Sequence, residues 1–192
     1  MIFFKQTSFC FLFVSMAIGL LTNSLYSQDG SSADKVDIEV KLSHEKVKQE
    51  GGFGVAIILD IKEPWHLNAH EPTLEYLIGT EITFDPREGY TLNDVTYPEP
   101  ESYEFDFVGG EELKVYGGKT IIFENIKIKD KLRSGSEIIG AEITLQACDK
   151  EVCLPPQETS IEIPFEVAGS GEEVSKINED LFSDYHLMNV NE

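Results

Sequence analysis

The chain has 192 residues and a formal net charge of −20 at pH 7, with 35 acidic and 15 basic residues. This length allows one domain of ordinary size with terminal tails. Such an acidic surface repels nucleic acid and anionic lipid, so both are excluded as partners. Solubility in a crowded exported compartment accounts for the acidity without any specific partner.

The N-terminal segment, residues 1–27, predicts an export signal. Lys5 is its only charged residue, the apolar run Phe9–Leu21 follows, and small or polar residues lead to a cleavage point expected near Ser27. The run is shorter than the roughly 20 residues of a membrane span. We therefore expect a soluble periplasmic protein that loses Cys10 together with its signal.

The next segments alternate between polar and apolar character. Residues 28–35 are polar and predict a linker. Val36–Leu42 alternates apolar and charged residues, which indicates a strand with one buried face. Gly54–Ile61 is a nearly continuous apolar run rich in β-branched residues, typical of a central strand. A new segment starts at Pro64, and further strands are expected at residues 80–84, 113–116, 120–128, 137–146 and 159–167.

Two further stretches show features other than the alternation of a central strand. Tyr97–Phe107 is rich in proline, glutamate and aromatic residues and predicts a long loop. In residues 159–167 the apolar side chains share one face, whereas Pro164 falls on the other, which favours an edge strand. Roughly seven or eight short strands, with no helical period between them, predict an all-β antiparallel β-sandwich over residues 36–167.

The composition shifts in the acidic tail, residues 168–192. Ser170 and Glu173 have the spacing of a capping box. Apolar residues then recur at three- and four-residue steps, which is the pattern of one helix face. They are Val174, Ile177, Leu181, Tyr185 and Met188. The tail therefore predicts a short C-terminal helix.

The motif LQACDKEVCLPP, residues 145–156, holds both cysteines of the expected mature chain. A zinc site needs four ligands of workable spacing. His44 and His186 are distant in sequence, and Trp65 and Pro72 oppose the helix that would aim His66 and His70 at one point. We therefore expect no metal ion and no other cofactor.

A structural staple and a redox pair remain as alternatives. A bridge between Cys148 and Cys153 closes a ring worth about 2 kcal/mol in the chain-entropy model, little for a domain with this much apolar strand. The turn at residues 149–152 can bring the two Cα atoms within disulfide reach. Lys150 would favour a thiolate, whereas the acidic residues on either side of it would oppose one.

The segment Ile143–Glu158 resembles the cysteine motif of the DsbD N-terminal domain family of thiol:disulfide interchange proteins. Asp60–Pro72 and Val115–Ile126 resemble the same family in the same order. The similarity extends from about Val36 to Val167. It implies an immunoglobulin-like fold whose cysteine pair receives electrons from a membrane partner and passes them to periplasmic disulfide isomerases or thioredoxin-like proteins.

The chain departs from the family pattern in two respects. Full-length members continue into a membrane domain, so here we expect a separate membrane electron donor. Tyr116 and Gly117 match the pair beside the family's cap loop, but Val115 stands where the family has an aromatic ring. Either Tyr116 covers the disulfide instead, or the disulfide is more exposed.

The resemblance also assigns roles within the motif. It makes Cys153 the cysteine that joins a partner and Cys148 the resolving group. Leu154, Pro155 and Pro156 form an apolar, stiff segment suited to docking on a partner. The sequence thus predicts an exported thiol–disulfide exchange domain. The alternative is a non-catalytic immunoglobulin-like binding module with an inert disulfide.

Overall fold

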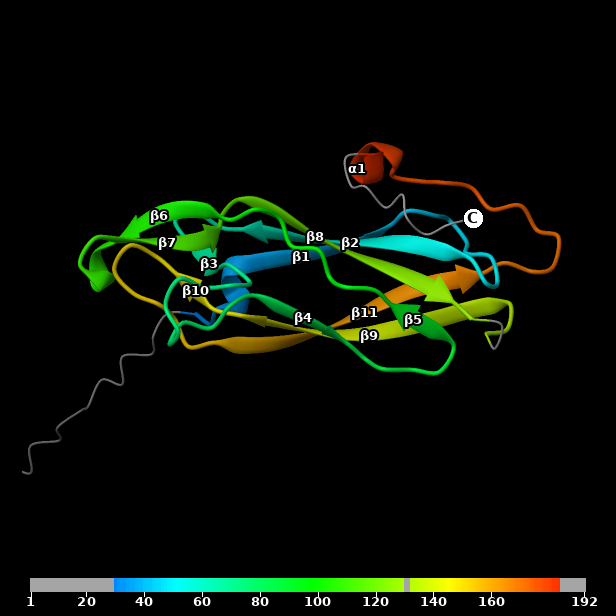
Figure 1. Ribbon diagram of the computed structural model, residues 1–192, viewed down its shortest axis with the longest axis horizontal. Helices are drawn as coiled ribbons and strands as arrows, with labels where there is room; N and C mark the ends of the chain where they lie inside the picture. Colours follow the sequence, from blue (N-terminus) through cyan, green and yellow to red (C-terminus); the bar gives the residue numbers. More distant parts are fainter. Residues whose placement is uncertain (1–29, 130–131, 184–192) are drawn as a thin grey trace, which may run out of the picture.

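The computed structural model describes residues 30–129 and 132–183 (Figure 1). The predicted signal segment, and Tyr185 and Met188 of the predicted helix face, lie outside these ranges. Over the described ranges, no helix has both the length and the apolar character needed to cross a membrane.

The described residues form three antiparallel sheets and one short helix. The sheet orders are β1-β2-β8-β5, β11-β9-β4 and β10-β3-β7-β6. The strands are β1 (Val36–Leu42), β2 (Gly52–Ile61), β3 (His66–Asn68), β4 (Glu81–Phe84), β5 (Tyr90–Leu92), β6 (Glu101–Phe105), β7 (Glu111–Tyr116), β8 (Lys119–Ile128), β9 (Gly135–Leu145), β10 (Ala147–Cys148) and β11 (Gln157–Val167).

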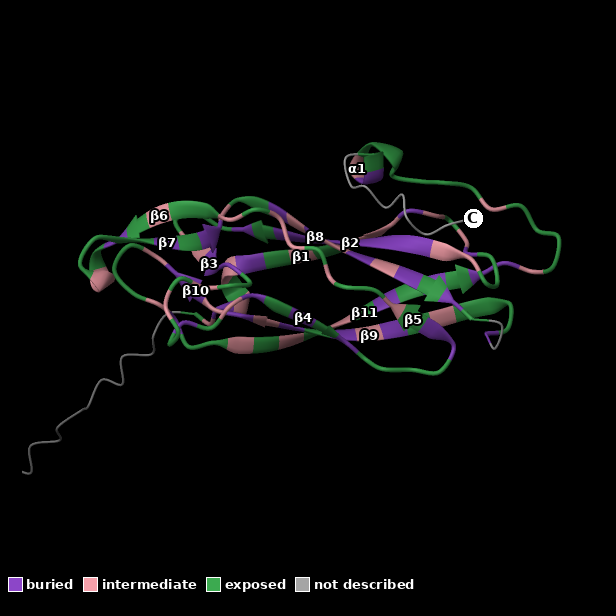
Figure 2. Cartoon of the chain, in the orientation of Figure 1, coloured by how far each residue is buried: buried purple, intermediate pink, exposed green. Residues whose placement is uncertain are grey.

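The first two sheets face one another and enclose the main core (Figure 1). The apolar run of β2 lies between β1 and β8, and its residues Val55–Leu59 are buried on both faces. Exposed and buried residues alternate along β9 and β11 (Figure 2). Phe53 of β2 stacks on Phe165 of β11 across the core, with 5.2 Å between ring centroids. The predicted immunoglobulin-like antiparallel sandwich is confirmed.

The third sheet lies at one end of the sandwich and has two different faces (Figure 1). Leu67 is paired with Ala147 and with Tyr116, and all three side chains belong to the main core. Because side chains alternate along a strand, their neighbours point the other way. Cys148 and Val115 therefore lie on the outer face, where a second apolar cluster forms.

The edge-strand prediction is confirmed, but the long-loop prediction is wrong. β11, which carries Pro164, is the edge of its sheet. Tyr97–Phe107 contains strand β6 and the start of a 3-10 turn, η2 (Asp106–Val108). Tyr103 of β6 pairs with Leu113 of β7 and faces the second cluster. The sequence did not predict this short aromatic-rich strand, because the glutamates and prolines around it are typical of a loop.

The C-terminal helix exists but starts later than predicted. It is α1 (Glu179–Ser183), whereas Ser170 lies in a turn, so the capping-box prediction is wrong. The Glu172 carboxylate beside this turn pairs with Lys46 at 2.5 Å. The buried residue of α1 is Phe182, whose ring lies 5.7 Å from that of Phe123 on β8. The helix therefore packs beside the first sheet, near β2 and β8 and away from β10 (Figure 1).

One carboxyl group points into the main core. Glu124 of β8 lies on the same face as Ile122 and Ile126 and is 1% exposed. Its Oε1 accepts a hydrogen bond from the Asn93 backbone N–H at 2.7 Å. Burial raises the pKa of Glu124 to about 7. At mildly acidic pH the folded protein therefore holds a proton here that the unfolded chain has released.

This buried acid predicts a pH-dependent stability. The raised pKa of Glu124 contributes stability that is full below about pH 4.5 and is lost as the pH rises through about 7. Glu124→Gln should flatten the fall in unfolding free energy between pH 5 and 8. Denaturant titrations should show the difference, with the exposed Glu142→Gln as the charge-matched control. An unchanged slope in Glu124→Gln would contradict the prediction.

Candidate functional site

The cysteine motif forms a tight disulfide-closed turn. Cys148 and Cys153 are bonded, with their Cα atoms 3.9 Å apart. The Asp149 carboxylate accepts hydrogen bonds from the backbone N–H groups of Glu151 and Val152, both at 2.9 Å. The predicted turn is therefore present. These two bonds to Asp149 form an Asx turn, which shapes the backbone between the two cysteines.

The two cysteines differ in burial. Cys148 is fully buried on β10, whereas Cys153 is only partly buried. Pro155 and Pro156 of the predicted docking segment are exposed. Leu154 is buried and packs in the main core instead. Of the two cysteines, only Cys153 is therefore partly exposed to solvent.

A cluster of apolar and aromatic side chains surrounds the buried cysteine of the disulfide, Cys148. It contains Leu77, Phe105, Leu113, Val115 and Cys148, with Leu74, Tyr103, Phe107, Val108 and Cys153 packed around them. The backbone N–H of Asp106, in η2, donates to the Lys150 carbonyl at 3.0 Å. The β6–η2 segment is thereby attached to the cysteine turn itself.

The residues of the predicted cap loop separate in the structure. Val115 lies in the cluster with Cys148, but Tyr116 lies in the main core, where its hydroxyl accepts a hydrogen bond from the His70 backbone N–H at 3.2 Å. Gly117 lets the β7–β8 turn approach its neighbours, because a Cβ there would lie 3.1 Å from His66. The aromatic rings that share a cluster with the two cysteines come from β6 and η2, whereas Tyr116 belongs to the main core.

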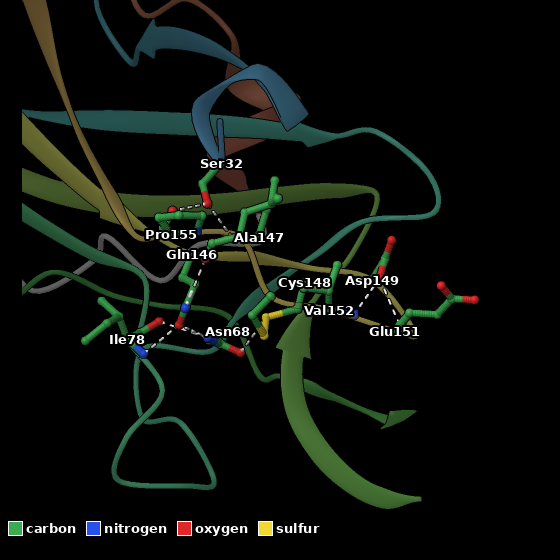
Figure 3. The surroundings of a disulfide bond; sticks show 12 residues. Ser32, Asn68, Ile78, Gln146, Ala147, Cys148, Asp149, Glu151, Val152 and Pro155 are labelled. Atoms are coloured by element: carbon green, nitrogen blue, oxygen red, sulfur yellow. Dashed lines mark hydrogen bonds between the residues drawn. A yellow bond between two sulfur atoms is a disulfide. The ribbon is translucent and has the colours of Figure 1, made fainter. Parts of the chain in front are cut away.

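A hydrogen-bonded amide pair borders the disulfide on the other side (Figure 3). Asn68 is 1% exposed, and its Nδ2 donates to the Ile78 carbonyl and to Gln146 Oε1, both at 3.0 Å. Gln146 in turn donates to the Leu154 carbonyl at 3.1 Å and accepts from the Ile78 backbone N–H at 2.9 Å. Neither amide had a role that could be assigned from the sequence.

Part of the predicted linker also belongs to the site. Ser32 is fully buried, just before a 3-10 turn, η1 (Ala33–Lys35). Its hydroxyl donates to the Pro155 carbonyl at 2.8 Å and accepts from the Ala147 backbone N–H at 3.1 Å (Figure 3). One side chain therefore fixes the backbone on both sides of the cysteine turn. Residues 30–35 are folded structure and not a linker.

The two neighbouring histidines occupy separate environments. His66 pairs with Cys148 across the sheet, and its ring lies tilted against that of Tyr103, with 4.1 Å between ring centroids. Burial lowers the pKa of His66, opposed in part by Glu101. His70 stacks on Tyr97 at 3.9 Å. Within the described ranges, no cluster of three or more histidine, cysteine or acidic side chains is arranged to hold a metal.

An immunoglobulin-like β-sandwich with a disulfide in a turn at one end is the class of protein that this geometry defines. Residues 39–164 match the family model described as thiol:disulfide interchange protein DsbD, N-terminal. The match covers well over half of the chain, so the chain belongs to this family. A comparison with curated proteins gave no match.

Two solved structures resemble the chain at low identity. The N-terminal periplasmic domain of ScsB from Proteus mirabilis aligns with 16% identity and a TM-score of 0.46, over 67% of this chain and 46% of that one. The DsbD N-terminal domain of Neisseria meningitidis, in its reduced form, aligns with 16% identity and a TM-score of 0.44. That alignment covers 77% of this chain and 94% of the other. The chain thus spans about half of the ScsB domain.

Proposed function

We propose that this chain is an exported thiol–disulfide exchange domain that passes electrons between partner proteins through Cys148 and Cys153. The family supports exchange chemistry. The observation that carries the proposal is the unequal burial of the two cysteines, because one cysteine of an exchange pair must meet the partner while the other resolves the mixed disulfide.

The exchange follows from this asymmetry. A thiolate of a reduced donor attacks Sγ of Cys153, and the electron pair of the broken S–S bond stays on Sγ of Cys148, which takes a proton. A second donor thiolate then displaces Cys153 from the mixed disulfide. The donor is left oxidised and the pair reduced by two electrons. The reverse steps pass the electrons to an acceptor disulfide, and no cofactor is required.

The partners follow from the family and from the surface beside Cys153. Val152, Pro155 and Pro156 are exposed next to this cysteine and offer an apolar contact whose prolines are stiff, so that docking costs little entropy. Thioredoxin-like proteins or disulfide isomerases would dock here as acceptors. A membrane partner would supply the electrons, and removal of the signal segment would leave the domain in the periplasm.

The alternative is a binding module with an inert structural disulfide. The full burial of Cys148 supports this alternative. Thiol counting separates the two functions. The oxidised protein should show no free thiol. After incubation with a reduced thioredoxin-like protein, it should show the thiols of Cys148 and Cys153 while the donor loses the same number. If thiols appear only after unfolding, the disulfide is a staple and the proposed function is wrong.

A further inference from the structure

The side-chain oxygen of Asn68 faces the buried sulfur of the disulfide. Oδ1 lies 3.8 Å from Sγ of Cys148, and both residues are almost completely buried. Asn68 and Cys148 come from neighbouring strands and lie on the same outer face of the third sheet, where Figure 3 shows Asn68 beside the sulfurs. The amide oxygen therefore lies beside one of the two atoms that gain and lose electrons.

The orientation of this amide is fixed by its other contacts. Its Nδ2 lies 3.0 Å from the Ile78 backbone carbonyl, which can only accept a hydrogen bond. The nitrogen must therefore point at Ile78, and Gln146 Oε1 accepts its second hydrogen. A flipped amide would place two acceptors against each other. Oδ1 is thus held toward Cys148 in the folded protein.

A disulfide sulfur carries no hydrogen, so in the oxidised protein Cys148 cannot donate to Oδ1. Within the described ranges, the Cys148 sulfur is the only neighbour whose geometry suits a hydrogen bond to this oxygen. A buried acceptor without a donor costs free energy. Reduction supplies the missing hydrogen, because a Cys148 thiol has an S–H group directed at Oδ1.

We infer that Asn68 accepts a hydrogen bond from the Cys148 thiol in the reduced protein, and that this contact favours the dithiol over the disulfide. Its part in electron transfer rests on the function proposed above. The partial negative charge of Oδ1 also disfavours a thiolate on Cys148. The proton that Cys148 takes up when the disulfide is reduced therefore stays on Cys148, and Cys153 is left as the nucleophile toward an acceptor.

The reduction midpoint of the pair tests this inference. Asn68→Leu keeps the size of the side chain but removes the acceptor. The variant also loses the two hydrogen bonds from Nδ2 to Ile78 and Gln146. This loss is the same in the oxidised and the reduced protein, so it should not change the midpoint. We expect the thiol–disulfide equilibrium constant to shift about tenfold toward the disulfide, which is a midpoint about 30 mV more negative.

The matched control is Thr80→Val. The Thr80 hydroxyl donates to the backbone carbonyl of Asn68 at 2.7 Å, and the Thr80 backbone N–H donates to the same oxygen. This variant removes a buried hydrogen bond at the same residue without touching Oδ1, and it should leave the midpoint unchanged. Equal midpoints for Asn68→Leu and the unsubstituted protein would overturn the inference, as would equal shifts in both variants.

A spectroscopic measurement covers the case in which Asn68→Leu does not fold. In Cys153→Ser, the infrared S–H stretch of Cys148 should lie at lower frequency than that of an unbonded thiol. An unbonded frequency would overturn the inference even without the leucine variant. If the unsubstituted disulfide resists every redox buffer, the proposed function fails instead, while the S–H band still tests the hydrogen bond.

Discussion

Covalent complexes with partner proteins should accumulate on Cys148→Ser in an extract of the native compartment, and few should form on Cys153→Ser. In the first variant the accessible Cys153 still attacks partner disulfides, but no second thiol is present to resolve the mixed disulfide. In the second variant the remaining Cys148 thiol is fully buried. Acid quenching, alkylation and non-reducing electrophoresis followed by mass spectrometry would measure both.

The variant that lacks both cysteines is the control for non-covalent capture. The adduct bands on the non-reducing gel should be absent for this variant. Dithiothreitol should release every adduct formed on Cys148→Ser. Adducts found chiefly on Cys153→Ser would reverse the roles given to the two cysteines. Adducts on neither variant would favour the inert staple.

Phe107→Ala should speed reduction of the disulfide by glutathione by about tenfold. Phe107 lies in η2, is partly buried and packs on the cluster that holds both cysteines. Removing its ring takes away roughly 1–2 kcal/mol of apolar burial that keeps the segment closed. A change of about 1.4 kcal/mol in opening corresponds to a factor of ten in the population that a thiol can reach. Stopped-flow thiol assays would give the rate.

The control is Phe182→Ala, which removes a ring of the same size away from the disulfide, where it packs on Phe123 of β8. It should leave the reduction rate unchanged. Tyr116→Ala should act mainly on stability, because the Tyr116 side chain belongs to the main core. If Tyr116→Ala speeds reduction and Phe107→Ala does not, the cover is the one that the family resemblance implied.

The long strands could be predicted from the sequence because each contains several periods of the alternating pattern. Val36–Leu42 was predicted with its observed bounds, and β2 and β8 with bounds within two residues. The shortest strands escaped detection. β10 has two residues and β5 has three, too few for a period to be visible. Their positions depend on pairing with distant strands, which local patterns do not report.

The site was predictable only in part. The spacing of Cys148 and Cys153 indicated the turn, but the partners of that turn come from far along the chain. Ser32 is 115 residues from Ala147, and its polar surroundings in sequence gave no sign of burial. Asn68 lies two residues after His66 in the same strand, so the two side chains are on the same face. His66 pairs with Cys148, and this places Asn68 on the face of the disulfide. Its contact with a sulfur 80 positions away required the fold.

The reduction potential of the Cys148–Cys153 disulfide tests the central claim most directly. The purified protein would be equilibrated with a series of dithiothreitol or glutathione buffers, quenched with acid, and its thiols counted by mass after alkylation. An exchange pair should titrate between about −270 and −120 mV, the range of thioredoxin-like proteins and their oxidising relatives. A midpoint below about −300 mV, as in structural disulfides of secreted proteins, would contradict the account.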